Sequence, residues 1–109
     1  MSEIISKLNR ILQERRHADP EQSYTASLYA KGNDAILDKI REEADEVVRA
    51  GQSTDKQALV HETADLLFHT LVLLVHHGLS ADDLLAELDR RFGQSGLEEK
   101  SKRSSKING

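Results

Sequence analysis

The chain has 109 residues, the size of one domain, and its lack of cysteine excludes disulfides and thiolate metal sites. Charged residues make up 31% of it and the net charge is −4, which argues against non-specific nucleic-acid binding. Good helix formers dominate and Pro20 is the single proline, so the composition predicts an α-helical protein. A core this small is marginal alone, which favours pairing with a second copy.

The first predicted helix runs from about residue 3 to residue 16, because apolar residues recur there at helical spacing. This opening stretch lacks the continuous apolar run of a signal peptide, so we expect a soluble, cytoplasmic protein. Asp19 and Pro20 end the helix. Residues 17–33 are expected to be irregular, with one helical turn around residues 26–29.

A second helix is predicted over residues 34–50, with Asn33 as its N-cap and Gly51 as the residue that ends it. A third helix should span residues 54–77 and end at Gly78.

The third helix decides the predicted architecture. Apolar side chains cover well over half of its circumference, and a helix of this kind is buried. Its most apolar run, residues 64–75, is too short to span a bilayer and is interrupted by Asp65 and His69. Four helices in one small monomer would not surround it. We therefore predict an all-α bundle of four to five helices whose core is completed by homodimerisation.

A fourth helix begins at Ser80, with Asp83 three residues later in a variant of the capping box. After Gly93 the chain becomes polar and rich in serine and lysine. We predict a single helical domain over residues 1–97 and a polar, mobile tail over residues 98–109.

Acidic residues cluster in the second helix, where residues 42–46 read EEADE. Glu42, Glu43 and Glu46 lie along one flank of the apolar stripe, with Glu43 nearest to it. Like charges at these spacings destabilise a helix by a few tenths of a kcal/mol per pair, and Lys39 offsets only part of that. A solvated charged face is the ordinary explanation, so this stretch alone identifies no site.

A second acidic pair lies on the apolar third helix, where Glu62, Asp65 and His69 share one face. Carboxylates on a largely buried helix are costly unless something compensates them, and a divalent cation would do so. A short connector favours antiparallel pairing of the two helices, which brings both acidic patches together. Oxygen ligands without cysteine favour Mg²⁺, with Mn²⁺ as the alternative, and indicate chemistry on a phosphate chain.

The spacing of E-E-x-x-E at residues 42–46 and E-x-x-D at residues 62–65 resembles the metal-binding signature of all-α, MazG-like nucleoside triphosphate pyrophosphohydrolases. Two flanking stretches, SYTASLYAKG at residues 23–32 and SGLEEK at residues 95–100, resemble the phosphoribosyl-ATP pyrophosphohydrolase family of histidine biosynthesis. The resemblance implies a MazG-like bundle and Mg²⁺-dependent hydrolysis of the α–β phosphoanhydride of phosphoribosyl-ATP to phosphoribosyl-AMP and pyrophosphate. The metal ligands that it implies are Glu43, Glu46, Glu62 and Asp65.

Hydrolysis of this bond needs positioning and charge neutralisation more than covalent catalysis. A carboxylate not fully committed to the metal would accept the proton of the attacking water, and Glu42 or Glu43 is predicted in this role. Lys31, directly before Gly32, is the first choice for a phosphate contact. The other predicted substrate-binding residues are Ser23, Tyr24, Thr25, Ser27, Lys100 and Arg103. The hydroxyls could instead cap a short turn, and the lysines could be solvated.

Two other functions fit parts of this pattern. A house-cleaning nucleoside triphosphate pyrophosphohydrolase would need the acidic cluster but neither flanking stretch. A non-catalytic helical dimerisation module would carry the acidic face without any dependence on Mg²⁺. His69 has two possible roles, as a partner of a carboxylate or as a core histidine with its hydrogen bonds satisfied. His61 is predicted to lie on the surface.

Overall fold

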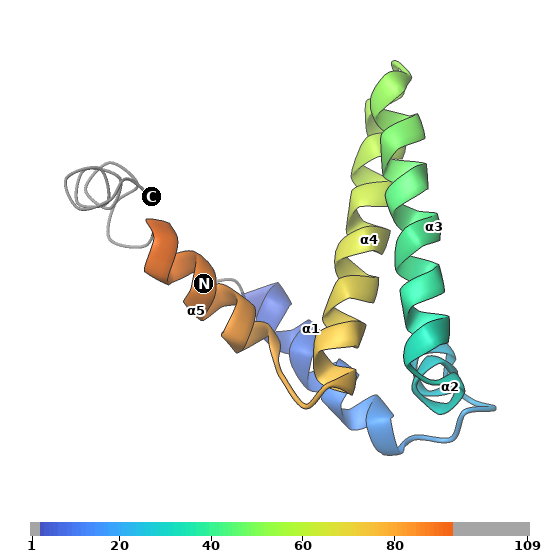
Figure 1. Cartoon of the computed structure of the whole chain (residues 1–109), viewed down its shortest axis with the longest axis vertical. Coiled ribbons are helices and arrows are strands. Elements are labelled where there is room, and N and C mark those ends of the chain that lie inside the picture. The colour runs from blue at the N-terminus through green and yellow to red at the C-terminus, as the bar shows by residue number, and fades with distance from the viewer. Residues whose placement is uncertain (1–2, 93–109) are drawn as a thin grey trace.

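The computed structural model describes residues 3–92, and the all-α prediction is confirmed over this range (Figure 1). The described elements are α1 (Glu3–Glu14), the 3-10 helix η1 (Arg15–His17), α2 (Tyr24–Lys31), α3 (Asn33–Gln52), α4 (Lys56–His76) and α5 (Ala81–Phe92). The predicted tail at residues 98–109, the SGLEEK stretch, Lys100 and Arg103 lie outside the described residues.

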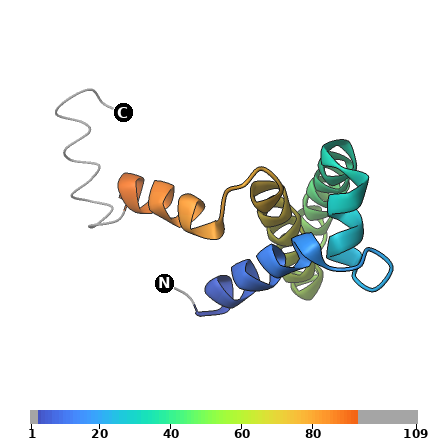
Figure 2. The same ribbon diagram turned by 90° about the horizontal axis from the view of Figure 1, so that it is seen from below.

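Helices α3 and α4 form a long antiparallel hairpin, as the short connector predicted, and α2 packs at its base (Figure 1). Helices α1 and α5 contact the lower part of α4 and lead away from the hairpin on the same side (Figure 2). The molecule is therefore open. Its Cα radius of gyration is 16.7 Å, whereas a compact domain of about 100 residues has a radius of about 13 Å.

The hydrophobic core lies at the base of the hairpin, where α1, α2, α3 and α5 meet the C-terminal half of α4. The largest fully buried side chains are Leu12, Ile36, Leu71, Val72 and Val75. Further along α4, by contrast, Val60 is 63% exposed and Leu67 is 39% exposed. The predicted burial of this helix is therefore confirmed within one chain only for its C-terminal half.

Helix α4 is 21 residues long and contains an 18-residue window with a mean hydropathy of 1.5, so by length and composition it could cross a membrane. The predicted apolar run of residues 64–75 is by itself too short to span a bilayer, but the helix begins earlier, at Lys56, with several uncharged residues. The core helix of a soluble protein passes the same test. Here α4 supplies Leu71, Val72 and Val75 to the core of the described domain.

The junction between α4 and α5 forms as predicted. Gly78 follows α4 with a φ of 79°, and the Leu79 N–H donates a hydrogen bond to the Leu74 carbonyl at 2.9 Å. This pairing is the Schellman motif, which favours glycine at the position with positive φ. The Ser80 N–H then donates to the Asp83 carboxylate at 2.9 Å, which is the predicted variant of the capping box.

Residues 17–33 are more regular than predicted. They contain the eight-residue helix α2 instead of one turn around residues 26–29. The hydroxyl oxygen of Ser23 accepts a hydrogen bond from the Ala26 N–H at 3.1 Å and so caps this helix. Gly32 ends it with a φ of 97°, a conformation that residues with a side chain rarely adopt.

Both predicted ends of α3 are wrong. Asn33 is the first helical residue and not the N-cap, and its side-chain oxygen is hydrogen-bonded to His77 Nε2 at 2.8 Å. At the other end the helix continues through Gly51 to Gln52, and the Ser53 hydroxyl donates to the last turn. A glycine inside a helix costs about 1 kcal/mol relative to alanine. The pairing of α3 with α4 outweighs that local preference.

Candidate metal and nucleotide site

Carboxylates from the two helices of the hairpin lie close enough to interact electrostatically. The Glu43 side chain on α3 is only 13% exposed. Burial, followed by the neighbouring Asp65 carboxylate of α4, raises the pKa of Glu43 above its ordinary value, and Glu62 raises it further. Three of the four predicted metal ligands therefore interact across the helix pair, and Glu43 is the most buried of the α3 glutamates in this cluster.

On α4, the side chains of His61, Glu62 and Asp65 each bring one potential ligand atom within 4.8 Å of the others. The Nε2 atom of His61 lies 3.4 Å from a carboxylate oxygen of Asp65. The predicted surface position of His61 is confirmed, because its side chain is 71% exposed. Its place beside the carboxylates was missed, although its spacing of four residues from Asp65 was a signal for it.

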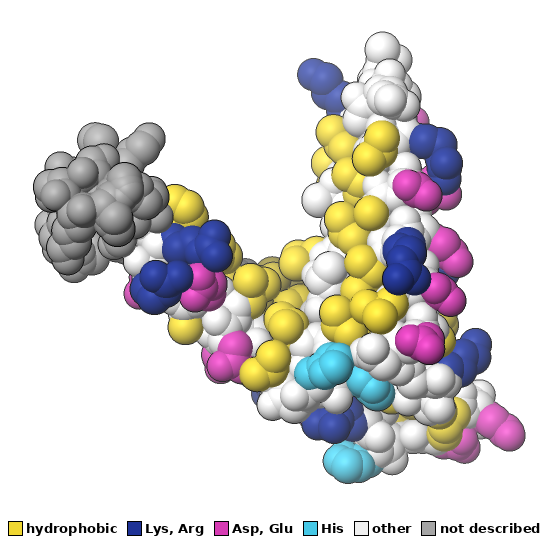
Figure 3. All heavy atoms as spheres, viewed as in Figure 1, with side chains coloured by type: hydrophobic (Ala, Val, Ile, Leu, Met, Phe, Trp, Pro, Cys, Tyr) yellow, Lys and Arg dark blue, Asp and Glu magenta, His cyan; other side chains and the backbone are white. Residues whose placement is uncertain are grey.

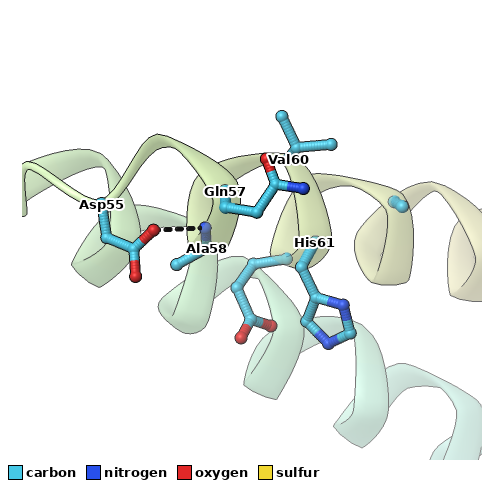
Figure 4. Close-up of a pocket in the computed structure, with 7 residues that line it drawn as sticks. Asp55, Gln57, Ala58, Val60 and His61 are labelled. Carbon is cyan, nitrogen blue, oxygen red and sulfur yellow. Dashed lines mark hydrogen bonds between the residues drawn. The ribbon is translucent and has the colours of Figure 1, made fainter.

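An open pocket lies along the N-terminal half of α4 (Figure 4). Its lining residues are Asp55, Gln57, Ala58, Val60, His61, Glu62 and Ala64. Asp55 caps α4 by accepting the Ala58 N–H at 3.0 Å, so the helix that carries the carboxylates has a well-defined start (Figure 4). Because Glu62 belongs both to the pocket wall and to the acidic cluster, a ligand has room directly beside the Glu62 carboxylate.

Lys39 places an ammonium group next to the α3 glutamates. Its Nζ lies 3.1 Å from Glu42 and 4.0 Å from Glu43. The hydrogen bond to Glu42 raises the pKa of Lys39, so this side chain stays protonated. The single positive charge of Lys39 is shared by two glutamates and does not neutralise the carboxylates of α4 as well. The cluster therefore keeps an excess of negative charge.

Glu46, the fourth predicted ligand, lies one turn beyond Glu42 and Glu43 on α3. Within the described part of the chain its carboxylate is paired with Arg49, whose Nη2 lies 3.2 Å away. Its entry into a metal site would require exchange of this exposed ion pair, which is worth little in solution.

Tyr24 and His69 join α2 to the same flank, although 45 residues separate them. The Tyr24 hydroxyl lies 2.9 Å from His69 Nε2, and His69 Nδ1 lies 2.8 Å from the backbone oxygen of Asp65. Burial, with additions from Glu43, Glu42 and Asp65, raises the pKa of Tyr24. His69 is thus a buried, satisfied histidine, and its partner at Asp65 is the backbone carbonyl and not the carboxylate.

The other predicted substrate-binding residues in the described range belong to α2 and its cap. Ser23 caps the helix, and the Ser27 hydroxyl donates to the Tyr24 carbonyl at 2.6 Å. Thr25 is buried, whereas Lys31 is exposed at the last position of the helix. The Ser23 hydroxyl therefore has a local capping role, and the Ser27 hydroxyl bonds to a carbonyl three residues earlier in its own helix. Lys31 is exposed to solvent.

The fold and the site are those expected of an all-α protein that acts on phosphate groups with the help of a divalent cation. A helical hairpin that gathers glutamate and aspartate side chains from two facing helices suits a hard divalent cation and the phosphate groups that such a cation binds.

Comparison with known proteins identifies the family within this class. Residues 5–92 match the family model of phosphoribosyl-ATP pyrophosphohydrolase. A protein named phosphoribosyl-ATP pyrophosphatase from Aromatoleum aromaticum is 51% identical over 102 residues, which cover 94% of each chain. Proteins of the same name are 52% identical in Methylococcus capsulatus, over 93% of this chain and 96% of that one, and 50% identical in Neisseria gonorrhoeae, over 93% and 94%. The chain belongs to the phosphoribosyl-ATP pyrophosphohydrolase family, as the sequence motifs implied.

Proposed function

We propose that this protein hydrolyses the α–β phosphoanhydride bond of phosphoribosyl-ATP and releases phosphoribosyl-AMP and pyrophosphate, in the second step of histidine biosynthesis. Family membership supports the reaction. The observations that carry the site are the group of ligand atoms from His61, Glu62 and Asp65 on α4 and the electrostatic interaction of Glu43 with Asp65 and Glu62 across the hairpin. We further propose a soluble, cytoplasmic enzyme without nucleic-acid or membrane partners, in keeping with its net charge of −4.

The side chains of the cluster fit a hard divalent cation. A partly buried carboxylate whose pKa is raised by burial and by a neighbouring carboxylate gains stability when a cation arrives. All the proposed donors are carboxylate oxygens, which Mg²⁺ prefers and Mn²⁺ accepts. The proposed metal ligands are Glu43, Glu46, Glu62 and Asp65. A bound ion of this kind neutralises phosphate charge and lowers the pKa of a coordinated water.

The remaining groups bind the substrate and accept a proton. Glu42 and Glu43 are the two proposed proton acceptors. Glu42 is exposed and its carboxylate is held by Lys39 at 3.1 Å, whereas Glu43 is also a proposed metal ligand. The ammonium groups of Lys39 and Lys31 would neutralise phosphate oxygens. The other proposed substrate contacts are Ser23, Tyr24, Thr25, Ser27, Lys100 and Arg103.

Release of pyrophosphate from phosphoribosyl-ATP is expected to require Mg²⁺. The full-length chain would be assayed with Mg²⁺ and again in excess chelator, where the rate should fall to background and return when Mg²⁺ is restored. Adenosine triphosphate and other nucleoside triphosphates should be poor substrates. Full activity in chelator would contradict the role of the metal. Faster turnover of ordinary or damaged nucleotides than of phosphoribosyl-ATP would instead indicate a house-cleaning hydrolase.

We also propose that the working unit is a homodimer. Large apolar side chains are exposed along the hairpin at Val48, Leu59, Val60 and Leu67. In Figure 3 hydrophobic side chains run up the visible face of the hairpin and continue along the arm that contains α5. Exposed apolar surface of this extent on a small, open chain favours association. A second copy would cover the half of α4 that this chain leaves uncovered.

A charge placed in this apolar surface is expected to dissociate the dimer. Val60→Lys should shift the mass measured by size-exclusion chromatography with light scattering from two chains towards one, because an ammonium cannot be buried without a partner. Gln22→Lys, which adds the same charge in the exposed turn before α2, is the matched control and should stay dimeric. A wild-type protein that is monomeric at micromolar concentration would contradict the proposal.

A further inference from the structure

We propose that Tyr24 and His69 form a positioning pair that ties α2 to the turn of α4 that carries Asp65, and that this pair sets how tightly the acidic cluster holds a divalent cation. The inference deepens the proposed function, since it concerns the same site. It assigns no metal ligand beyond those already named. Tyr24 and His69 act on the metal through the residues that they hold in place.

The hydrogen-bond chemistry of the pair has a defined direction. The Asp65 carbonyl can only accept, so the His69 Nδ1, 2.8 Å away, carries the hydrogen. In the neutral imidazole the Nε2 is then an acceptor, and the Tyr24 hydroxyl at 2.9 Å donates to it. The chain of bonds runs from a phenol on α2, through the imidazole, to the backbone of a proposed metal ligand.

The surroundings of His69 hold its ring in one orientation. The residue is 5% exposed, and its ring meets the Tyr24 and Phe68 rings edge to face, with centroids 5.9 Å and 5.1 Å away. In an α-helix the backbone N–H of His69 faces the carbonyl of Asp65, four residues earlier. The ring and the backbone of His69 therefore contact the same carbonyl group. A buried imidazole that lost its phenol partner would have an unsatisfied nitrogen and could turn, which would release this peptide group.

Bonds that hold a ligand-bearing residue in place affect a metal site measurably. Loss of an outer partner that orients a ligand typically lowers metal affinity or activity 10–100-fold. The pair therefore reaches the acidic cluster through the Asp65 backbone on α4.

The chain contains a matched control for the Tyr24 hydroxyl. Tyr29 lies on the same helix, and its hydroxyl donates to the Leu12 carbonyl at 2.9 Å. Its ring stacks on His76, with centroids 6.0 Å apart, away from the carboxylates. Tyr24→Phe and Tyr29→Phe each remove one oxygen atom and one hydrogen bond of equal length from α2. Only the first of these bonds leads to the proposed metal site.

The experiment measures Mn²⁺ affinity by calorimetry, without substrate, for the wild type and both variants of the full chain. Tyr24→Phe is expected to weaken Mn²⁺ binding by about tenfold, and Tyr29→Phe by less than twofold, although Tyr29→Phe should lower the melting temperature. In steady-state assays, Tyr24→Phe should raise the Mg²⁺ concentration needed for half-maximal rate by a similar factor. Unchanged metal affinity in Tyr24→Phe, or an equal loss in both variants, would overturn the proposal.

A second measurement separates this inference from the proposed function. Nitrogen-15 NMR of the His69 imidazole in the metal-free wild type should show hydrogen on Nδ1, and the Nε2 shift should move in Tyr24→Phe. Hydrogen on Nε2 instead would overturn the positioning pair whatever the enzyme hydrolyses. A protein that binds Mn²⁺ as predicted but does not cleave phosphoribosyl-ATP would overturn the proposed reaction and leave the pair supported.

Discussion

Substitution of Asp65 by asparagine is expected to lower Mg²⁺-dependent pyrophosphate release from phosphoribosyl-ATP by about a thousandfold. A metal ion is worth several kcal/mol of transition-state stabilisation, and each 1.36 kcal/mol is a factor of ten in rate. Asparagine keeps the size of the side chain and leaves the backbone carbonyl that His69 contacts in place. The change therefore removes one negative charge from the cluster with little change in packing. Steady-state assays over a range of Mg²⁺ concentrations measure the loss.

The matched control for this variant is Asp45→Asn. Asp45 belongs to the same EEADE stretch, but it is exposed, and on the helical wheel it lies off the flank shared by Glu42, Glu43 and Glu46. Its substitution should change the rate by less than threefold. A thousandfold loss in Asp45→Asn, or full activity in Asp65→Asn, would show that the helix pair does not bind the metal as proposed.

Glu43→Gln should stabilise the metal-free protein against heat by a few degrees at neutral pH, while it removes the stabilisation that Mg²⁺ confers on the wild type. The Glu43 carboxylate is 13% exposed, and burial and then Asp65 raise its pKa above the ordinary value of 4.5. Its ionised form is therefore less favourable in the folded chain than in the unfolded one. Glutamine has nearly the same shape and carries no charge. It therefore removes this penalty, and it also removes the negative charge of a proposed metal ligand.

The difference in melting temperature between Glu43→Gln and the wild type should depend on pH, in a direction set by the raised pKa of Glu43. Because the pKa is raised on folding, the unfavourable contribution of Glu43 is absent below 4.5, where the carboxyl is protonated in both states. The contribution develops fully as the pH rises through the raised pKa. Melting temperatures in chelator should thus differ between wild type and Glu43→Gln at neutral pH and converge below pH 4.5. Glu21→Gln, at an exposed turn, should show no such pH-dependent difference.

A Glu43→Gln protein that is less stable than the wild type at neutral pH in chelator would contradict the unfavourable environment assigned to this carboxylate. Retention of the full Mg²⁺-induced rise in melting temperature would show that Glu43 is not a ligand. The two outcomes are independent, because the first concerns the empty cluster and the second the bound ion.

The amino-acid sequence by itself determined the helical class, the antiparallel pairing of the two long helices and the face on which the carboxylates lie. These features follow from local chemistry. Apolar spacing at about 3.6 residues places Glu43 next to the buried stripe, and short-range hydrogen bonds fix the ends of helices at Gly78 and at Ser80 with Asp83. Each of these interactions joins residues only a few positions apart, and so a periodic pattern is enough to predict it.

Only the tertiary structure decided the rest. Gly51 lies inside α3 although glycine alone favours a helix end, because packing of α3 against α4 outweighs a local cost of about 1 kcal/mol. The bond between Tyr24 and His69 spans 45 residues, and no local spacing encodes it. The exposure of Val60 likewise depends on where α1 and α5 leave the hairpin. Contacts between distant segments depend on the packing of whole elements, which a pattern read along one chain does not contain.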